Sequence, residues 1–164
     1  MYMTKFDESK AHYIAVTAII IKDKKFLIVK RSENEKAFPG RWVVPGGKLE
    51  RKDYEGRKRD TEPAWYNMLE GVVRREVLEE TGLKIKGVRY LASLVYIRDD
   101  NIPTLVISTF ADYKSGKVKL IPALTEYKWA TLKEAKKYNL ISGVWKELEM
   151  VDKVVKGKKV GEWK

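Results

Sequence analysis

The stretch Arg74-Arg75-Glu76-Val77-Leu78-Glu79-Glu80-Thr81-Gly82-Leu83 says most about the fold of this chain. On an α-helix, Glu76, Glu79 and Glu80 follow one another at i, i+3 and i+4, so their carboxylates lie on one face. Apolar residues upstream recur at the same spacing: Trp65, Met68, Leu69, Val72 and Val73. The sequence therefore predicts an amphipathic helix whose core-facing stripe becomes acidic in its last two turns.

The ends of this helix are also indicated by local residues. Thr61-Glu62-Pro63 has the composition of a helix start, with Thr61 as the N-cap and proline in the first turn. Thr81-Gly82 has the composition of a helix end, with glycine as the C-cap. We expect the helix to run from about Thr61 to Thr81.

The acidic stripe needs a compensating charge. Like charges at these spacings destabilise an isolated helix by a few tenths of a kcal/mol per pair, and a bound cation offsets the repulsion. Mg²⁺ prefers oxygen ligands and shares its coordination shell with substrate phosphates. Arg75 precedes Glu79 by one helical turn and can pair with a carboxylate there. An acidic helix segment is more often a solvated surface, and its coincidence with the apolar stripe leaves a metal site open as an equal alternative.

The segment from Gly46 to Leu83 resembles the signature of the Nudix hydrolase family, G-x5-E-x7-R-E-U-x-E-E-x-G-U, in which U is an aliphatic residue. The second half matches at every fixed position: Arg75, Glu76, Val77, Glu79, Glu80, Gly82 and Leu83. The first half is present as Gly47, preceded by Pro45-Gly46, and Trp42 stands where the family often has tryptophan. The chain is identified as a member of that family.

The chain departs from the signature in two ways. Asp53 stands where the family has glutamate, and Tyr54 to Arg74 spans 21 residues where the family has seven, an insertion of 14. If the insertion follows Asp53, then Asp53 takes the family role, and if it precedes that position, Glu62 could take it. Extra loop length costs little stability, but the insertion could reshape one wall of the substrate cleft.

The resemblance implies an α+β fold, the Nudix α/β/α sandwich, with a mixed β-sheet and the signature forming a loop–helix–loop. It implies that Glu76, Glu79 and Glu80, with the backbone carbonyl of Gly46, bind Mg²⁺ as the cofactor, with Mn²⁺ as the alternative. Glycine at positions 46 and 47 would let the backbone approach metal and phosphate closely.

The reaction implied by the resemblance is hydrolysis of a phosphoanhydride bond in a nucleoside diphosphate linked to another moiety. The substrate could be a nucleoside triphosphate, ADP-ribose or a nucleotide sugar, with water attacking phosphorus. Glu79 or Glu76 would serve as the base, with Arg75 as a third catalytic residue. Glu126 is the candidate for an accessory acid, ahead of Asp99 and Asp100, although each is more often ordinary surface charge.

Residues flanking the presumed cleft are candidates for substrate binding. Arg31 and Lys48 could hold phosphate. Trp42 could stack on a nucleobase or pack beside the glycine loop, and we favour packing. We interpret His12 as a structural or surface residue rather than a catalytic one. Trp65 and Tyr66 could pack against the sheet or form the contact of a homodimer.

The rest of the chain alternates β-rich runs with turns and ends in short helices. We predict strands at 12–22, 26–30, 41–44, 88–97, 104–113 and 127–130, and helices at 131–137 and 142–155. Residues 51–60 are polar and predict a surface loop. We expect one domain over residues 1–164, with a frayed basic tail at about 156–164.

Composition excludes several kinds of site. The 164 residues include no cysteine and a single histidine, which excludes disulfides, thiolate nucleophiles, zinc–sulfur sites and multi-histidine metal sites. No apolar run reaches the roughly 18 residues of a membrane span, and the first ten residues lack a signal-peptide hydrophobic region. We therefore expect no membrane association and a cytoplasmic location.

The formal charge of +11 suggests polyanionic partners. We favour a lysine coat that only solvates the surface, but two other functions stay open. One is an RNA-directed protein that binds RNA or trims its 5′ end, which salt-dependent affinity for RNA would reveal. The other is a non-catalytic nucleotide-binding module, from which metal-dependent product release would distinguish the enzyme.

Overall fold

The structure, a computed structural model, describes residues 6–163. The strands are β1 (Tyr13–Lys22), β2 (Lys25–Arg31), β3 (Trp42–Val43), β4 (Gly46–Lys48), β5 (Lys84–Ile97), β6 (Pro103–Ser115) and β7 (Leu124–Ala130). The α-helices are α1 (Met68–Thr81), α2 (Leu132–Ala135) and α3 (Val144–Val155), and two short 3-10 helices are η1 (Glu8–Lys10) and η2 (Arg51–Asp53).

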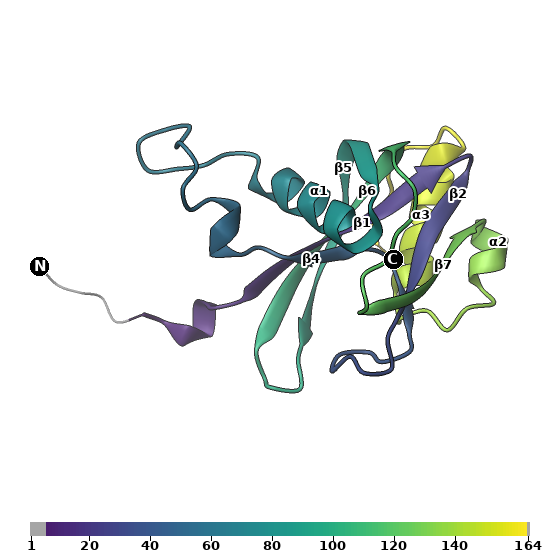
Figure 1. The fold of residues 1–164 in the computed structure, drawn as a ribbon, viewed down its shortest axis with the longest axis horizontal. Coiled ribbons are helices and arrows are strands. Elements are labelled where there is room, and N and C mark those ends of the chain that lie inside the picture. Colours follow the sequence, from purple (N-terminus) through teal and green to yellow (C-terminus); the bar gives the residue numbers. More distant parts are fainter. Residues whose placement is uncertain (1–5, 164) are drawn as a thin grey trace, which may run out of the picture.

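The strands form one mixed sheet, as predicted (Figure 1). Its order is β3-β2-β1-β6-β5, with β4 paired to β1 and β7 paired to β2. The β1–β6 pair is parallel, from Tyr13 opposite Thr104 to Ile21 opposite Asp112, and the other pairs are antiparallel. Gly46–Lys48, which we expected to be part of a loop, is therefore held against β1 as a short strand.

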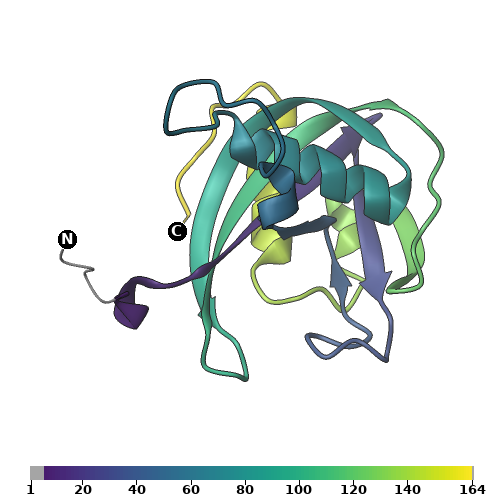
Figure 2. The same ribbon diagram turned by 60° about the vertical axis from the view of Figure 1, so that its left-hand side comes forward.

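Helices cover both faces of this sheet. Alternation along β1 sends Val16, Ala18 and Ile20 to the face under α1. Ile19 points to the opposite face, where the buried residues Leu148 and Val151 of α3 join it in a second core. The result is three layers, with α1 crossing the front of the sheet in Figure 2. This arrangement confirms the predicted α/β/α sandwich.

The start of α1 differs from our prediction. The helix begins at Met68, after Asn67 at φ 55°, and Thr61 forms a β-bridge with Ala64 instead of an N-cap. The apolar spacing from Met68 onward holds, with Val72, Val73 and Val77 fully buried. Trp65 belongs instead to the inserted loop, because its ring packs 5.2 Å from the Tyr54 ring. Trp65 has the helical spacing of the other apolar residues, but it packs against Tyr54 in the loop and is not part of the helix.

The end of α1 agrees with the sequence. Gly82 has φ 72° and its amide donates to the Leu78 carbonyl at 2.9 Å, as a glycine C-cap does. The amides of Lys119 and Ile121 donate to the carbonyls of Thr81 and Glu80 at 2.9 and 3.3 Å. The segment after β6 therefore satisfies carbonyls that the helix itself leaves free.

The C-terminal elements also follow the predicted pattern. Thr131 caps α2 in a reciprocal capping box with Glu134. Residues 156–163 are exposed and contain no helix or strand. No helix among the described residues is both long and apolar enough to span a membrane.

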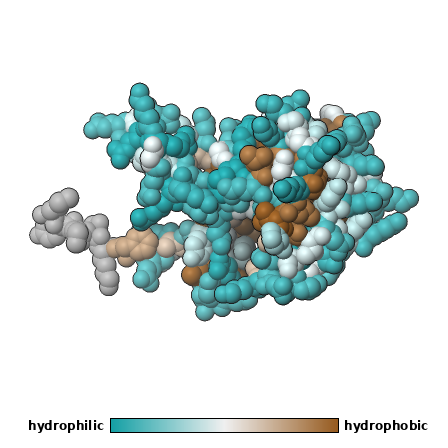
Figure 3. All heavy atoms as spheres, in the orientation of Figure 1, coloured by the Kyte–Doolittle hydropathy of each residue, from teal (hydrophilic) through white to brown (hydrophobic). Residues whose placement is uncertain are grey.

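Hydrophobic surface gathers to the right of the centre of Figure 3, near the second half of α1, where Leu78 is exposed.

Candidate active site

The acidic face of α1 packs directly on β4. The Gly46 amide donates to Glu80 Oε2 at 3.0 Å. A Cβ on Gly47 would overlap the carboxyl group of Glu76, so any other residue here would force that carboxyl group to move. A Cβ on Gly46 would likewise collide with the backbone of β1 at Val16 and Thr17. Glycine at position 47 therefore lets β4 approach the Glu76 carboxylate, and glycine at position 46 lets β4 approach β1.

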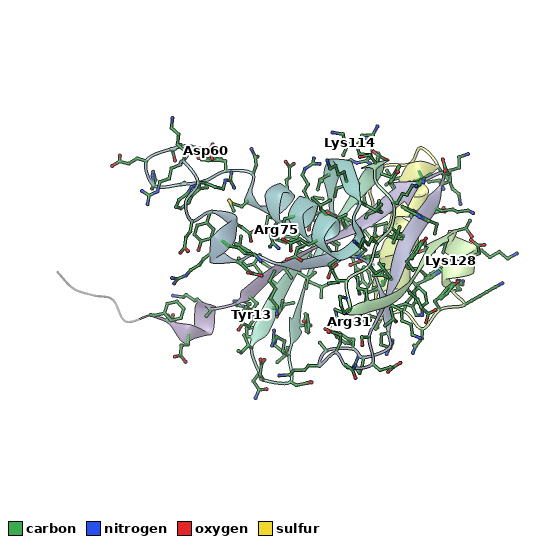
Figure 4. All side chains as sticks on the ribbon, viewed as in Figure 1. Tyr13, Arg31, Asp60, Arg75, Lys114 and Lys128 are labelled. Atoms are coloured by element: carbon green, nitrogen blue, oxygen red, sulfur yellow. The ribbon has the colours of Figure 1, made fainter. Side chains whose placement is uncertain are left out.

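Arg75 connects the acidic face to the segment before the insertion. Its Nε lies 2.5 Å from Asp53 Oδ1, and its Nη2 donates to Asp53 Oδ2 at 3.1 Å. Its Nη1 lies 2.9 Å from both Glu76 Oε1 and Glu79 Oε2. Nη2 also donates to the Lys48 carbonyl at 3.2 Å. Arg75 points from α1 toward η2 and β4 in Figure 4 and holds these three elements together.

Asp53 is the acid that the fold brings to the signature helix, which the spacing alone left open. Its side chain is only 5% exposed, and η2 aims it at Arg75. Glu62 is exposed, and its carbonyl accepts from Arg59 in the inserted loop. The insertion therefore follows Asp53. Figure 4 shows Asp60 at the far end of this loop, away from Arg75.

Two carboxylates of the acidic face, Glu76 and Glu80, are partly buried and only partly compensated by positive charge and hydrogen bonds. Burial, with the nearby Glu76 carboxylate, raises the pKa of Glu80 to about 7, against the opposing hydrogen bond from Gly46. Burial also raises the pKa of Glu76, although Arg75 partly counters it. For Asp53 burial acts upward, but the hydrogen bonds from Arg75 and the Glu50 amide lower its pKa overall. One arginine does not neutralise this face.

The carboxylates do not enclose a common point. No three acidic or histidine side chains among residues 6–163 stand where they could hold one metal ion. Glu79 accepts a hydrogen bond from Arg75, and Glu80 accepts one from the Gly46 amide. The expected metal ligands, Glu76, Glu79, Glu80 and the Gly46 carbonyl, are therefore not arranged around a single point. The chemistry of the donors still fits a hard divalent cation, because such a cation prefers carboxylate oxygens and would favour the charged form of Glu76 and Glu80, whose pKa values burial raises.

The two expected phosphate-binding residues lie beside the acidic face. Arg31 is near enough for its charge to lower the Glu80 pKa, yet its guanidinium binds Glu35 at 2.8 Å and the Ala37 carbonyl at 2.7 Å. Lys48 is exposed at the end of β4, with Nζ 5.1 Å from the Tyr13 ring centre. Arg31 is therefore committed to its own loop, while Lys48 faces solvent.

Other predicted site residues lie elsewhere. Trp42 is only 8% exposed and packs edge-on against Tyr138 in the core under α3, which matches packing rather than stacking on a base. Glu126 binds Lys30 at 2.9 Å on the β2–β7 pair. Asp100 pairs with Arg98 at 2.9 Å at the tip of the β5–β6 hairpin, and Asp99 is exposed there. None of these residues is part of the acidic cluster, by which we mean Glu76, Glu79 and Glu80 on α1 together with Asp53 and Arg75.

One neighbour of the site was not predicted from the sequence. Tyr13, at the start of β1, is 41% exposed and lies beneath two cations, Lys48 and Arg98, at 5.1 and 5.0 Å. Its position depends on the pairing of β1 with both β4 and β6. No local motif marks it, because the contacts join three distant segments.

Comparisons with known proteins agree with this geometry. The model of the NUDIX domain matches residues 11–152. The MutT NUDIX hydrolase from Burkholderia pseudomallei has a TM-score of 0.68 at 22% identity, over 87% of this chain and 99% of that one. The MutT protein from Methanosarcina mazei Go1 has a TM-score of 0.66 at 27% identity, over 92% and 98%.

A third similar structure contains a ligand. The NUDIX domain of Shewanella oneidensis NrtR, complexed with ADP ribose, has a TM-score of 0.68 at 20% identity, over 92% of this chain and 94% of that one. A comparison with curated proteins gives no match. With the family model covering most of its length and the signature carboxylates packed on the glycine strand, the chain belongs to the NUDIX domain family.

Proposed function

We propose that this protein is a metal-dependent pyrophosphohydrolase that cleaves a phosphoanhydride bond in a nucleoside diphosphate linked to another moiety. The observation that carries the proposal is the packing of Glu76 and Glu80 on Gly46 and Gly47, with Arg75 tied to Asp53 beside them. A cluster of partly buried carboxylates with one arginine is costly for packing alone. It is useful where a cation and a diphosphate bind together.

The positions of the residues support the following roles. Glu76, Glu79 and Glu80, with the backbone of Gly46, would hold Mg²⁺ or Mn²⁺, which would supply charge neutralisation at the phosphoryl oxygens and an acidified water. Glu79 or Glu76 takes the proton of the water that attacks phosphorus. Arg75 bridges both carboxylates and is itself fixed by Asp53, so it holds the base in one orientation. Lys48 is free to bind a substrate phosphate.

The substrate class is inferred from the chemistry of the site and from the similar structures. The NrtR domain was solved with ADP ribose, a nucleoside diphosphate linked to a second sugar. Two other similar structures are MutT proteins. A cation site next to exposed lysine suits any substrate of this kind, and a basic chain of +11 attracts such anions. We therefore propose nucleoside triphosphates, ADP-ribose and nucleotide sugars as the substrate group.

Product analysis tests the proposal directly. The purified protein is incubated with nucleoside triphosphates, ADP-ribose, nucleotide sugars and dinucleoside polyphosphates, first with Mg²⁺ and then with EDTA. We expect cleavage of one class in Mg²⁺ and none in EDTA, with ¹⁸O from water in one product. Absence of turnover on every compound by folded, Mg²⁺-bound protein would leave a non-catalytic binding module as the better explanation.

Variants on α1 locate the chemistry. Glu79→Gln should lower kcat by about two orders of magnitude or more, because it removes a charge from the proton acceptor or the cation site. Glu70→Gln is the matched control, since Glu70 is exposed in the first turn of the same helix. Both variants should unfold at the temperature of the parent protein. Near-parental turnover by Glu79→Gln would exclude Glu79 from the reaction.

A further inference from the structure

A groove lies on the α1 side of the sheet, beyond the C-terminal end of the helix. It has a volume of about 360 Å³, and the residues that line it are Lys22, Leu83, Tyr113, Gly116, Lys117, Val118, Tyr127 and Trp129. None of the residues of the acidic cluster lines it. The volume lies in the range of small-molecule sites. The groove is therefore separate from the candidate active site.

The position of the lining side chains follows from the strand register. Tyr127 and Trp129 lie opposite Val29 and Leu27, both of which face the core under α1. Lys22 continues the β1 face of Val16, Ala18 and Ile20. The β7 aromatic residues and the β1 lysine therefore project to the same side, at an end of the sheet that α1 does not reach.

The groove combines aromatic rings with positive charge. The Lys22 ammonium lies 4.3 Å from the Tyr113 ring centre and 5.7 Å from that of Trp129. The Tyr113 and Trp129 rings meet edge-on at 6.2 Å, and Tyr127 is 47% exposed beside them. A partly exposed ring next to an ammonium group offers a stacking surface and a cation at once.

No negative charge opposes this in the groove. No acidic residue lines it, and among residues 6–163 neither Lys22 nor Lys117 forms an ion pair. The carbonyl end of α1, which would repel anions, is already bonded by the amides of Lys119 and Ile121.

We propose that this groove is a binding site for a nucleobase that carries phosphate, separate from the site of hydrolysis. The base stacks on Tyr127 beside Trp129, and the phosphate lies between the ammonium groups of Lys22 and Lys117. The same chemistry is offered by a free mononucleotide and by a nucleotide within a single RNA strand, and the experiment below distinguishes them.

Binding is measured in EDTA, so that hydrolysis plays no part in the result and the proposed reaction is tested separately. The probes are a fluorescein-labelled ten-nucleotide oligoadenylate, followed by anisotropy, and unlabelled AMP and tripolyphosphate as competitors. Tyr127→Ala and Lys22→Gln should each raise the Kd at least about fivefold. Binding of the oligonucleotide that AMP cannot displace identifies an RNA strand as the ligand, and displacement by AMP identifies a mononucleotide.

The matched control is a second lysine–aromatic pair. Lys136 lies 4.3 Å from the Trp145 ring centre in a smaller groove of about 260 Å³ between α2 and α3. Lys136→Gln removes the same charge from the same kind of contact and should leave the Kd within twofold. Thermal unfolding of all three variants verifies the fold. Equal affinity of Tyr127→Ala and the parent protein, or displacement by tripolyphosphate as effective as by AMP, would overturn the proposal.

Discussion

At Gly47 the absence of a side chain decides where a carboxylate can lie. A methyl group there would overlap the carboxyl carbon of Glu76, and Glu76 is also paired with Arg75. Because the Glu76 side chain is already confined by burial, it has to rotate away from β4 if Gly47 gains a Cβ. The geometry of the acidic face is therefore sensitive to one atom on the neighbouring strand.

We predict that Gly47→Ala lowers kcat/KM at least about tenfold, since a displacement of about an ångström at a reacting group costs that much or more. The control is Gly71→Ala in α1, where a Cβ meets no atom within 4 Å. That change should raise stability by about 0.5–1 kcal/mol, because alanine loses less backbone entropy in a helix. Steady-state kinetics and urea unfolding give both numbers. Parental activity of Gly47→Ala would show that the contact has no bearing on the reaction.

Glu147 on α3 is a buried carboxyl far from the signature residues in sequence. It is 5% exposed and accepts a hydrogen bond from Ser108 Oγ at 2.7 Å. Burial raises its pKa above the ordinary value of 4.5, and the Ser108 hydrogen bond only partly opposes this. The folded state therefore binds this proton more tightly than the unfolded chain does.

The raised pKa of Glu147 makes the stability of the folded state depend on pH. Between the ordinary pKa of 4.5 and the raised folded value, the folded state holds more protons, so stability falls as pH rises through that range. We predict that Glu147→Gln, which keeps a hydrogen-bonding group beside Ser108, is more stable than the parent protein at pH 8. The difference should vanish near pH 4. Urea unfolding across this range measures it, and a constant difference at all pH values would contradict the prediction.

Among the elements, the inserted loop between η2 and α1 is ordered by its own contacts. The Trp65 indole donates to the Arg57 carbonyl at 3.0 Å, and the Arg59 guanidinium lies 5.0 Å from the Trp65 ring centre. The amide of Tyr66 donates to Asp60 at 2.9 Å. These contacts give the loop a small centre of its own around one indole ring, as in a compact surface loop.

We predict that Trp65→Ala loosens the loop, so that trypsin cleaves more readily after the basic residues at 57–59, which are already exposed. Native-state cleavage there should become several-fold faster, because local opening governs proteolysis of a folded chain. Tyr66→Ala is the matched control, since its side chain is 60% exposed and should have little effect. Cleavage is followed by mass spectrometry. Equal cleavage rates in both variants would mean that Trp65 does not order the loop.

For the whole molecule, the dominant property is its charge. A formal +11 on 164 residues makes the compact state repel itself, and salt screens that repulsion. The screening length falls from about 10 Å at 0.1 M to about 3 Å at 1 M ionic strength. The ion pairs whose two partners are both exposed, such as Lys10–Asp7 and Lys52–Glu50, contribute little, so their weakening by salt does not cancel the gain.

We predict that the Tm rises when NaCl increases from about 0.05 to about 0.5 M. The control is a triple variant, Lys133→Gln, Lys137→Gln and Lys158→Gln, at exposed positions, which lowers the formal charge from +11 to +8 (11 − 3). Its Tm should rise less with salt. Differential scanning calorimetry compares the two series. A Tm that falls with salt in the parent protein would show that attractive ion pairs dominate.

The sequence by itself determined the elements whose causes are local. The carboxylate stripe and the glycine end of α1 follow from helical spacing and from the left-handed backbone that Gly82 adopts. The capping box at Thr131 and the alternating strands likewise depend on residues a few positions apart. The family followed from the same stretch, because its signature is a local pattern.

Only the tertiary structure decided the questions that depend on which distant segments meet. Asp53, and not Glu62, is the partner of Arg75, because η2 packs on α1 while Glu62 lies exposed in the insertion. Trp65, which the helical spacing places on α1, lies outside that helix and packs against Tyr54. The groove at Tyr127 joins three strands and the loop after β6. Periodicity states which face a residue takes but not what covers that face, since side-chain contacts are settled by packing between elements.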